Sequence, residues 1–347
     1  MVIKMEKSVY RNDEFFKHKI IFIHVPKVAG RAMLKSLNIE EVGHNHLFIY
    51  ELEDRRKFQE FFKIGFVRNP WDRLVSAFFY LKSGGMKNKY DLYIQDKLSS
   101  FNSFTEFVYC LGSNKQFRKE MIKEIHFKPQ YLWMMNSNGE IEMDYIGYFE
   151  NLEEGFKILK EKLKKPNAEL IKFNQSEHKP FWEYYDKKMV DIVREIYATD
   201  IELFKYEFPA NNKFIKDISK QNKDIEVNYK KLNVAENFIN EFLMQSIQER
   251  PIYIWGTGIG GKVTFNLLRN KSVKILGFID NDSNKWGSLF CGYKVFPPRI
   301  LKNYYNTKPY VIIGSMYYEE ISIQLKNLGL NEKEDYCVNF LFIGNVL

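Results

Sequence analysis

Cysteine is scarce in this chain of 347 residues. Its three cysteines, Cys110, Cys291 and Cys337, stand far apart and form no CxxC pair. An odd number of isolated cysteines argues against a disulfide framework, and the lack of clustered ligands argues against a zinc site. The sequence therefore favours a reducing compartment and predicts no bound metal.

Long apolar runs are lacking as well. The first 19 residues, "MVIKMEKSVYRNDEFFKHK", contain no apolar core of signal-peptide length. No window reaches the roughly 18 apolar residues that a membrane span requires. We therefore expect a cytoplasmic protein without a transmembrane segment.

Neither sign of charge dominates the composition. The balance of 52 Lys and Arg against 44 Asp and Glu leaves a formal net charge of +8, which can attract an anionic ligand. No long basic run or tract of interleaved Arg and aromatic residues is present, which argues against nucleic acid as a partner. A focused anion site is the better expectation.

What remains is the composition of an ordinary globular protein, with 45% hydrophobic and 28% charged residues. At about 150 residues per domain, the length suggests two domains. Short apolar runs alternate with helical patterns over residues 1–209, as in an α/β domain. A polar Asn- and Lys-rich linker and a connecting helix are expected over residues 210–249, and a second α/β pattern fills residues 250–347.

Two strand–turn–helix units stand out in the first domain. "IIFIHV" at residues 20–25 predicts a buried strand, and "GRAMLKSL" at 30–37 begins a helix. "FFKIGFV" at 61–67 predicts a second strand, and "PWDRLVSAFFYLK" at 70–82 has Pro70 in its first helical turn. Two further amphipathic helices are expected in "NLEEGFKILKEKLKK" and "YDKKMVDIVREIYATDIELFKYEF".

A basic residue follows each of these two strands. In "HVPKVAGRAM", Lys27 is placed to meet a phosphate and Gly30 allows close approach of the backbone. The Walker pattern GxxxxGK[ST] is absent, which argues against an ordinary ATP-binding loop. In the second turn, Arg68, Arg73 and Ser76 supply an arginine fork and a hydroxyl suited to a terminal phosphate. Two anion sites on neighbouring turns predict a ligand with two phosphate-like ends.

These turns resemble the signatures of sulfotransferases that use 3′-phosphoadenosine 5′-phosphosulfate (PAPS), in the carbohydrate and heparan-type branch. The family's first signature, typically Pro-Lys-Thr-Ala-Gly-Thr-Ser, corresponds to residues 26–32, and its second, Val-Arg-Asn-Pro-Tyr/Trp-x-Arg-Leu-Val-Ser, is complete at residues 67–76. The resemblance continues through "HFKPQYLW" and "DYIGYFENLEEGFKIL" and covers residues 19–208. It implies a fold similar to that of P-loop NTPases, with a central parallel sheet.

The resemblance also implies which residues bind PAPS as co-substrate. They are Pro26, Lys27, Val28, Ala29, Gly30, Arg31 and Ala32 around the 5′-phosphosulfate, and Arg68, Arg73 and Ser76 around the 3′-phosphate. Val28, Arg31 and Ala32 stand where the family usually has Thr or Ser. We expect backbone N–H groups to do most of that binding, with the Arg31 guanidinium in place of a hydroxyl.

Sulfuryl transfer needs a base for the acceptor hydroxyl and positive charge at the leaving phosphate, a role that suits Lys27. Related sulfotransferases have a histidine between the two signatures, in the pattern His-x-x-x-x-Glu-Leu, which His46 matches here. His46 is the first candidate for the base and His44 the second, with Glu40 and Glu41 as outside candidates. His126 is expected to be a structural or acceptor-site residue.

The second domain opens with a glycine-rich turn. "GTGIGG" supplies Gly256, Gly258 and Gly261 as a GxGxxG pattern, and Asp280 ends the next strand. The sequence resembles small Rossmann-like modules attached to enzymes of sugar and surface-glycan biosynthesis, which implies a second nucleotide site that takes a sugar nucleotide. The alternative is a module for packing or oligomerisation. A dehydrogenase is disfavoured because no substrate domain is evident.

We therefore expect a sulfotransferase that acts on a hydroxyl of a glycan or glycan precursor, in polysaccharide biosynthesis. A nucleotide phosphotransferase is a second hypothesis, but the Walker lysine and the magnesium-binding Ser/Thr that follows it are lacking. A binding or scaffold protein of a glycan-assembly complex, with a degenerate sulfotransferase fold, is the third. The sequence indicates neither the acceptor nor the oligomeric state.

Overall fold

The computed structural model describes residues 8–171, 179–209, 247, 250–269, 271–302, 307–315, 317–332 and 334–339. These fall into two compact units. The first contains the described residues 8–134 and 142–209, and the second contains 135–141 and those from 250 onward. The predicted linker and connecting helix lie outside the described residues, apart from Ile247.

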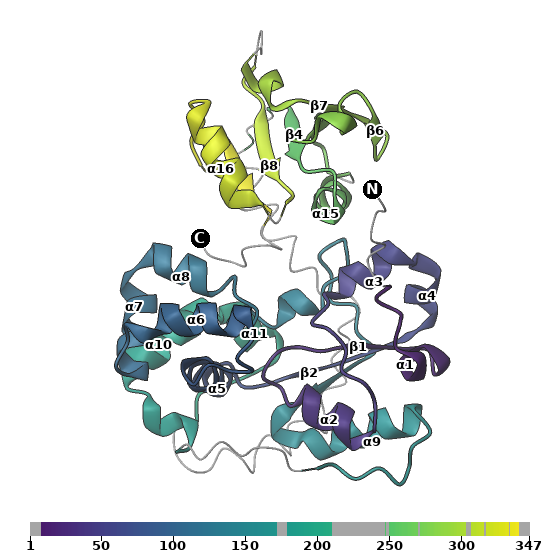
Figure 1. Cartoon of the computed structure of the whole chain (residues 1–347), viewed down its shortest axis with the longest axis vertical. Coiled ribbons are helices and arrows are strands. Elements are labelled where there is room, and N and C mark those ends of the chain that lie inside the picture. Colours follow the sequence, from purple (N-terminus) through teal and green to yellow (C-terminus); the bar gives the residue numbers. More distant parts are fainter. Residues whose placement is uncertain are drawn as a thin grey trace. The chain divides into compact units, whose positions relative to one another are not determined.

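The described part of the first unit is built on a three-stranded parallel sheet in the order β1-β2-β3 (Figure 1). Its strands are β1 (Ile20–Ile23), β2 (Phe62–Val67) and β3 (Tyr145–Tyr148). The apolar runs that predicted the first two strands are buried nearly throughout, as is usual for parallel strands covered on both faces. The carboxyl ends of β1 and β2 therefore lie side by side.

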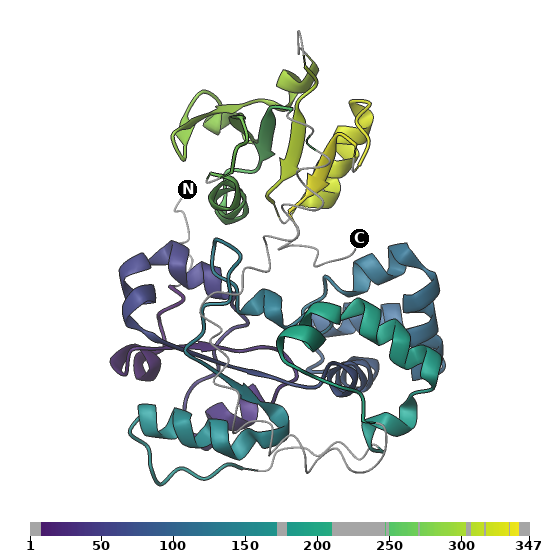
Figure 2. The ribbon, with the colours of Figure 1, turned by 180° about the vertical axis from the view of Figure 1, so that it is seen from behind.

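Helices surround this sheet. They are α1 (Asp13–Lys17), α2 (Gly30–Ser36), α3 (Leu47–Glu53), α4 (Arg55–Glu60), α5 (Pro70–Lys82), α6 (Lys89–Ser99), α7 (Phe104–Ser113), α8 (Lys115–Met121), α9 (Leu152–Lys162), α10 (Lys187–Ile196) and α11 (Ala198–Leu203). Short 3₁₀ segments cover Tyr131–Trp133, Phe149–Asn151 and Phe181–Tyr184. Figures 1 and 2 show α6, α7, α8 and α10 gathered at one end of this unit, and α2 and α9 together on one side of it.

Most predicted elements of the first unit are confirmed, with two differences. Strand β1 ends at Ile23, so His24 and Val25 belong to the turn that follows. The long helix expected from Tyr185 onward divides at Tyr197 into α10 and α11. Helix α5 matches its prediction because Asn69 caps it and the ring of its first residue, Pro70, suits a helix start.

Large aromatic side chains fill the core of the first unit. Trp71 and Trp133 are almost fully buried. The indole Nε1 of Trp71 donates to the carbonyl oxygen of Val190, and its ring packs edge-on against Phe208. Trp71 is therefore a core residue.

The described part of the second unit contains a six-stranded sheet in the order β6-β7-β5-β4-β8-β9. Its strands are β4 (Ile252–Trp255), β5 (Ile275–Ile279), β6 (Leu289–Phe290), β7 (Tyr293–Phe296), β8 (Tyr310–Ile313) and β9 (Tyr336–Val338). All neighbouring strands are parallel except β6 and β7. Helices α15 (Ile259–Leu268) and α16 (Tyr318–Asn327) follow β4 and β8, and 3₁₀ segments cover Ser283–Lys285 and Pro298–Lys302. The α/β pattern predicted for residues 250–347 is confirmed in the described part of this range, and the strand predicted to end at Asp280 is β5.

None of the helices in the described residues combines the length and the apolar character that crossing a bilayer requires. All three cysteines are free thiols in this structure.

Candidate functional site

The first candidate turn joins β1 to α2. Lys27 and Ala29 both adopt left-handed backbone conformations, with φ of 70° and 64°. Residues other than glycine rarely do so, and such strain often accompanies functional turns. Gly30 opens α2 against the imidazole of His24, because a Cβ at position 30 would overlap Cδ2 and Nε2 of that ring. The absence of a side chain at Gly30 is thus explained by His24, the residue that follows β1.

The second candidate turn joins β2 to α5 and contacts the first turn directly. The guanidinium of Arg68 donates to both carboxylate oxygens of Asp72, at 2.7 and 2.8 Å. Its Nη1 also donates to the carbonyl oxygen of Lys27 at 3.1 Å. The arginine predicted to bind a 3′-phosphate therefore lies against the lysine predicted to bind the 5′-phosphosulfate, and part of its hydrogen-bonding capacity is already used.

Arg73 is directed at the backbone. It is 2% exposed, and its guanidinium donates to the carbonyl oxygens of Pro26 at 3.1 Å and Lys128 at 2.8 Å. This arrangement holds the first turn in place and uses the Nε and Nη2 groups of the guanidinium. Ser76 lies on α5, two helical turns after Arg68, and is half-buried.

The ammonium group of Lys27 lies over the ring of Tyr80, 3.8 Å from the ring centroid. Burial, together with the charges of Arg68 and Arg31, lowers the pKa of Lys27 to about 7. Several cations thus crowd one place near the ends of two strands. An anionic ligand would relieve their mutual repulsion.

The other predicted residues of the first turn have varied surroundings. The side chains of Val28 and Ala32 are buried, so neither presents a group to a ligand. Arg31 pairs with Glu41, with 2.8 Å between Nε and Oε1, and both side chains are exposed. Glu41, an outside candidate for the base, is therefore an ion-pair partner, and Glu40 is exposed.

Both histidines between the turns are oriented by backbone carbonyl groups. Nδ1 of His44 lies 2.6 Å from the carbonyl oxygen of His24, and Nδ1 of His46 lies 2.8 Å from that of Leu132. A carbonyl oxygen only accepts, so each Nδ1 carries the proton and each Nε2 keeps its lone pair. The ring of His46 also stacks on Trp133, with centroids 4.3 Å apart. Burial lowers the pKa of both imidazoles, to about 3 for His46, so both are neutral at pH 7.

The sequence analysis missed His24 and left His126 without a defined place. His24 is 4% exposed and its ring centroid is 4.3 Å from that of His44. His126 packs against Tyr80, with centroids 5.3 Å apart, and its buried Nδ1 has no hydrogen-bond partner among the described residues. The position of His24, directly after the apolar run of β1 and three residues before Lys27, was the signal that could have identified it.

A buried polar network supports Arg68 from behind. The side-chain amide of Gln130 accepts from the Arg68 N–H at 2.9 Å and donates to its carbonyl oxygen at 2.8 Å, as a neighbouring strand would. The carboxylate of Asp200 in turn accepts from the backbone N–H groups of Gln130 and Tyr131. Gln130 and Asp200 are fully buried. They fix the end of β2, and the sequence analysis did not identify them.

The glycine turn of the second unit has the expected position. Gly256 has a φ of 126°, and a Cβ there would lie 2.6 Å from the carbonyl oxygen of Gly314. A Cβ at Gly261 would overlap the carbonyl group of Gly256, whereas one at Gly258 would meet nothing within 4 Å. Asp280 accepts from the N–H and hydroxyl groups of Thr257 at the same turn. The four predicted residues therefore lie together at the ends of β4 and β5.

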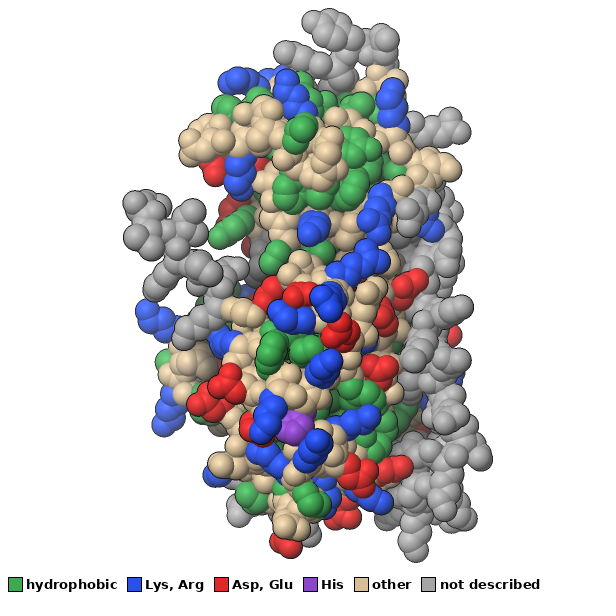
Figure 3. All heavy atoms as spheres, turned by 90° about the vertical axis from the view of Figure 1, so that its right-hand side faces the viewer, with side chains coloured by type: hydrophobic (Ala, Val, Ile, Leu, Met, Phe, Trp, Pro, Cys, Tyr) green, Lys and Arg blue, Asp and Glu red, His purple; other side chains and the backbone are tan. Residues whose placement is uncertain are grey.

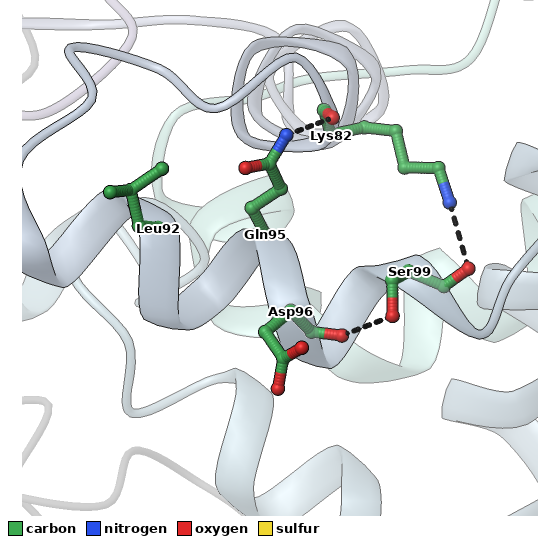
Figure 4. Close-up of a pocket in the computed structure, with 5 residues that line it drawn as sticks. All are labelled: Lys82, Leu92, Gln95, Asp96 and Ser99. Atoms are coloured by element: carbon green, nitrogen blue, oxygen red, sulfur yellow. Dashed lines mark hydrogen bonds between the residues drawn. The ribbon is translucent and has the colours of Figure 1, made fainter.

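A separate pocket of about 400 Å³ lies on α5 and α6 (Figure 4). It is lined by Lys82, Leu92, Gln95, Asp96 and Ser99. The ammonium of Lys82 already donates to three backbone carbonyl oxygens near the end of α6, so it is not a free cation for an anionic ligand. This pocket includes no residue that the sequence predicted.

Surface charge on the face drawn in Figure 3 is mixed. Lys and Arg side chains surround a histidine there, and Asp and Glu side chains are interspersed among them. Within the described residues, no three His, Cys, Asp or Glu side chains come together in a group that could hold a metal ion.

Comparisons with known proteins agree with the division into two units. Residues 15–207 match the model of a family described as "Sulfotransferase family", and residues 248–335 match one described as "C2185-like, N-terminal". The chain is 28% identical over 236 residues to carbohydrate sulfotransferase 14 of Danio rerio, which covers 57% of this chain and 62% of that protein. It is 29% identical over 121 residues to an uncharacterized protein of Archaeoglobus fulgidus, covering 35% of this chain and 82% of that protein. The chain thus spans less than two thirds of the Danio rerio relative.

Proposed function

We propose a specific reaction from the premise that this chain belongs to the sulfotransferase family. Its first unit transfers a sulfuryl group from PAPS to a hydroxyl of a glycan or glycan precursor. The carbohydrate acceptor is supported by the relative whose name includes that substrate class. The position within polysaccharide biosynthesis follows from the same acceptor.

The observation that carries this proposal is the contact between the two turns. Arg68 donates to the backbone carbonyl oxygen of Lys27, so the turns that follow two neighbouring parallel strands meet at one place. The pKa of Lys27, lowered by burial and by the nearby arginines, fits a site that is completed by an anion. We assign Lys27 and the N–H groups of residues 28–32 to the 5′-phosphosulfate, and Arg68 with Ser76 to the 3′-phosphate.

His46 is our candidate for the base, with His44 as the alternative. PAPS supplies a sulfuryl group on a phosphate leaving group. Nε2 of the neutral imidazole takes the proton of the acceptor hydroxyl as the new S–O bond forms. Lys27 places positive charge against the phosphate oxygen that keeps the electrons of the broken bond. The Nδ1 hydrogen bond to Leu132 and the stacking on Trp133 hold the His46 ring in one orientation.

For the second unit we propose a Rossmann-like module that binds a nucleotide, with a sugar nucleotide as the expected ligand. The order of its parallel strands, β7-β5-β4-β8-β9, reverses direction between β4 and β8, where such folds bind ligands. Packing explains Gly256 and Gly261, but the space beside Gly258 is open. A module for packing or oligomerisation remains the rival proposal. The free cysteines support our placement of the protein in the reducing cytoplasm.

The test of the reaction is transfer of label from ³⁵S-PAPS to a panel of glycans and sugar nucleotides, with and without EDTA. We expect transfer that EDTA does not change. Binding of the desulfated product, 3′-phosphoadenosine 5′-phosphate (PAP), is measured in parallel by calorimetry. Absence of both transfer and PAP binding would refute the proposal. PAP binding without transfer to any acceptor would instead favour the binding or scaffold protein.

The choice of base is tested with matched single variants. His46→Ala should lower turnover by about 10²-fold or more while PAP affinity stays unchanged. His44→Ala should have a smaller effect on turnover. A fully active His46→Ala variant beside an inactive His44→Ala variant would assign the base to His44.

A further inference from the structure

The ammonium of Lys27 has a defined position in the structure. It lies 3.8 Å from the centroid of the Tyr80 ring, within the range of a strong cation–π contact. Tyr80 lies near the end of α5, four residues after Ser76, where the second signature ends. The lysine predicted to act on the leaving phosphate therefore rests on an aromatic side chain that no signature includes.

The Tyr80 ring is itself fixed by Asp91 on α6. The Tyr80 hydroxyl donates to Oδ2 of Asp91 at 3.2 Å. The same oxygen accepts from the Met86 N–H at 2.7 Å and from Nδ2 of Asn88 at 3.1 Å. Asp91 is 2% exposed, so its carboxylate is held in a fully protein-lined position.

The turn between α5 and α6 is shaped around this pair. Gly85 has a φ of 52°, and a Cβ there would lie 2.8 Å from Cγ of Asp91 and 3.0 Å from Cε1 of Tyr80. On another side, the imidazole of His126 packs against the Tyr80 ring. These close contacts prevent the ring from moving away from Lys27.

We propose that Tyr80 and Asp91 are positioning residues for Lys27: the Tyr80 ring holds the ammonium group, and Asp91 fixes the ring and supplies compensating negative charge. This inference rests on the proposed function, because it assigns Lys27 to the sulfuryl donor. Its consequence is that, before the donor binds, the Lys27 ammonium is held in place and keeps its proton more firmly than burial and the arginines alone would allow.

The sign of the effect follows from the charges around Lys27. The charged and titratable groups around Lys27 come from α2, the second turn, α5, α6 and the segment after α8, namely Arg31, Arg68, Arg73, Tyr80, Asp91 and His126. The arginines lower the pKa of Lys27, as burial does, and Asp91 raises it. Removing the Asp91 charge or the Tyr80 ring should therefore make the ammonium lose its proton at a lower pH.

The experiment measures the titration midpoint of the Lys27 amine directly, in the absence of PAPS. Trace acetic anhydride labels only the neutral amine, and mass spectrometry of the peptide that contains Lys27 gives the extent of labelling at each pH. We expect a midpoint near the pKa of about 7 for the unchanged protein. In Asp91→Asn and in Tyr80→Leu the midpoint should fall by about half a unit or more. Tyr80→Phe keeps the ring face and should stay within half a unit.

Asp96→Asn is the matched control, because Asp96 is an exposed carboxylate on the same helix. It should leave the midpoint unchanged. If Asp91→Asn fails to fold, the comparison of Tyr80→Leu with Tyr80→Phe decides alone. A fall of less than half a unit in Tyr80→Leu, or an equal fall in Tyr80→Phe, overturns the inference. A protein that shows neither transfer nor PAP binding refutes the sulfotransferase proposal but leaves this labelling result readable.

Discussion

Replacing Gly30 by alanine tests the contact that shapes the first turn. A Cβ at this position would overlap Cδ2 and Nε2 of His24 and would lie 3.3 Å from its Cγ. The ring has little room to move, because it packs 4.3 Å from His44 and Nδ1 is held by the carbonyl oxygen of Val42. We therefore expect Gly30→Ala to displace either the ring or the start of α2.

The effect of Gly30→Ala on the free energy of unfolding depends on two opposing contributions. Alanine in place of glycine favours a helix by about 0.5–1 kcal/mol. Overpacking a buried contact costs about 1–3 kcal/mol, so the steric term should win. A shift of about 1 Å in a binding turn can lower activity by about 10²-fold. Gly30→Ala should therefore destabilise the first unit and weaken PAP binding together.

Hydrogen exchange on peptides from residues 20–37 reports the stability of the first unit separately from the second, and calorimetry gives PAP affinity. Gly43→Ala is the control, since its Cβ would meet only Asn45, at an ordinary 3.5 Å. In a His24→Ala background, Gly30→Ala should be neutral or slightly stabilising because the obstructing ring is gone. The steric reasoning fails if Gly30→Ala stabilises the protein that retains His24.

Three further predictions concern buried polar groups and the second unit. Gln130→Leu leaves the N–H and carbonyl groups of Arg68 without their partner and should lower the free energy of unfolding by about 2–4 kcal/mol, measured by urea denaturation. Burial raises the pKa of Asp200 from 3.8 to about 6, so the contribution of its protonated carboxyl to stability is fully present below pH 3.8 and is lost as the pH rises through about 6. Asp200→Asn should reduce this decline in the free energy of unfolding with rising pH. An unchanged pH profile of that free energy would contradict the prediction. Gly261→Ala should destabilise the second unit, whereas Gly258→Ala should keep its stability and lose nucleotide binding; normal binding of UDP-sugars by Gly258→Ala would count against the nucleotide site.

Local patterns predicted the elements that carry the candidate site. Helix α5 was predictable to the residue because Pro70 suits a first helical position and Asn69 is a good cap. The place of Arg68 was predictable because an apolar run that ends in a basic residue puts that residue at a strand end. The signal in each case lies within a few residues of chain.

The residues of the candidate site that the sequence did not predict depend on contacts between distant segments. Gln130 hydrogen-bonds the backbone of Arg68 across 62 residues, and Asp200 reaches Gln130 across 70. No local pattern marks a glutamine as the partner of a strand end. Tyr80 could not be predicted for the same reason. In the sequence its ring is one more apolar position of α5, and only the fold places the Lys27 ammonium over its face.

The two predicted anion sites are physically one structure. Lys27 and Ala29 adopt left-handed conformations that cost roughly 1–2 kcal/mol each. Arg68 and Arg73 donate to the carbonyl oxygens of Lys27 and Pro26, and hydrogen bonds from charged groups contribute about 1.5–3 kcal/mol each. These bonds are large enough to offset the strain, so the second turn holds the first in shape. Under the proposed function, a variant of Arg68 should therefore weaken binding at both ends of PAPS, and its loss of affinity would not report the 3′-phosphate contact alone.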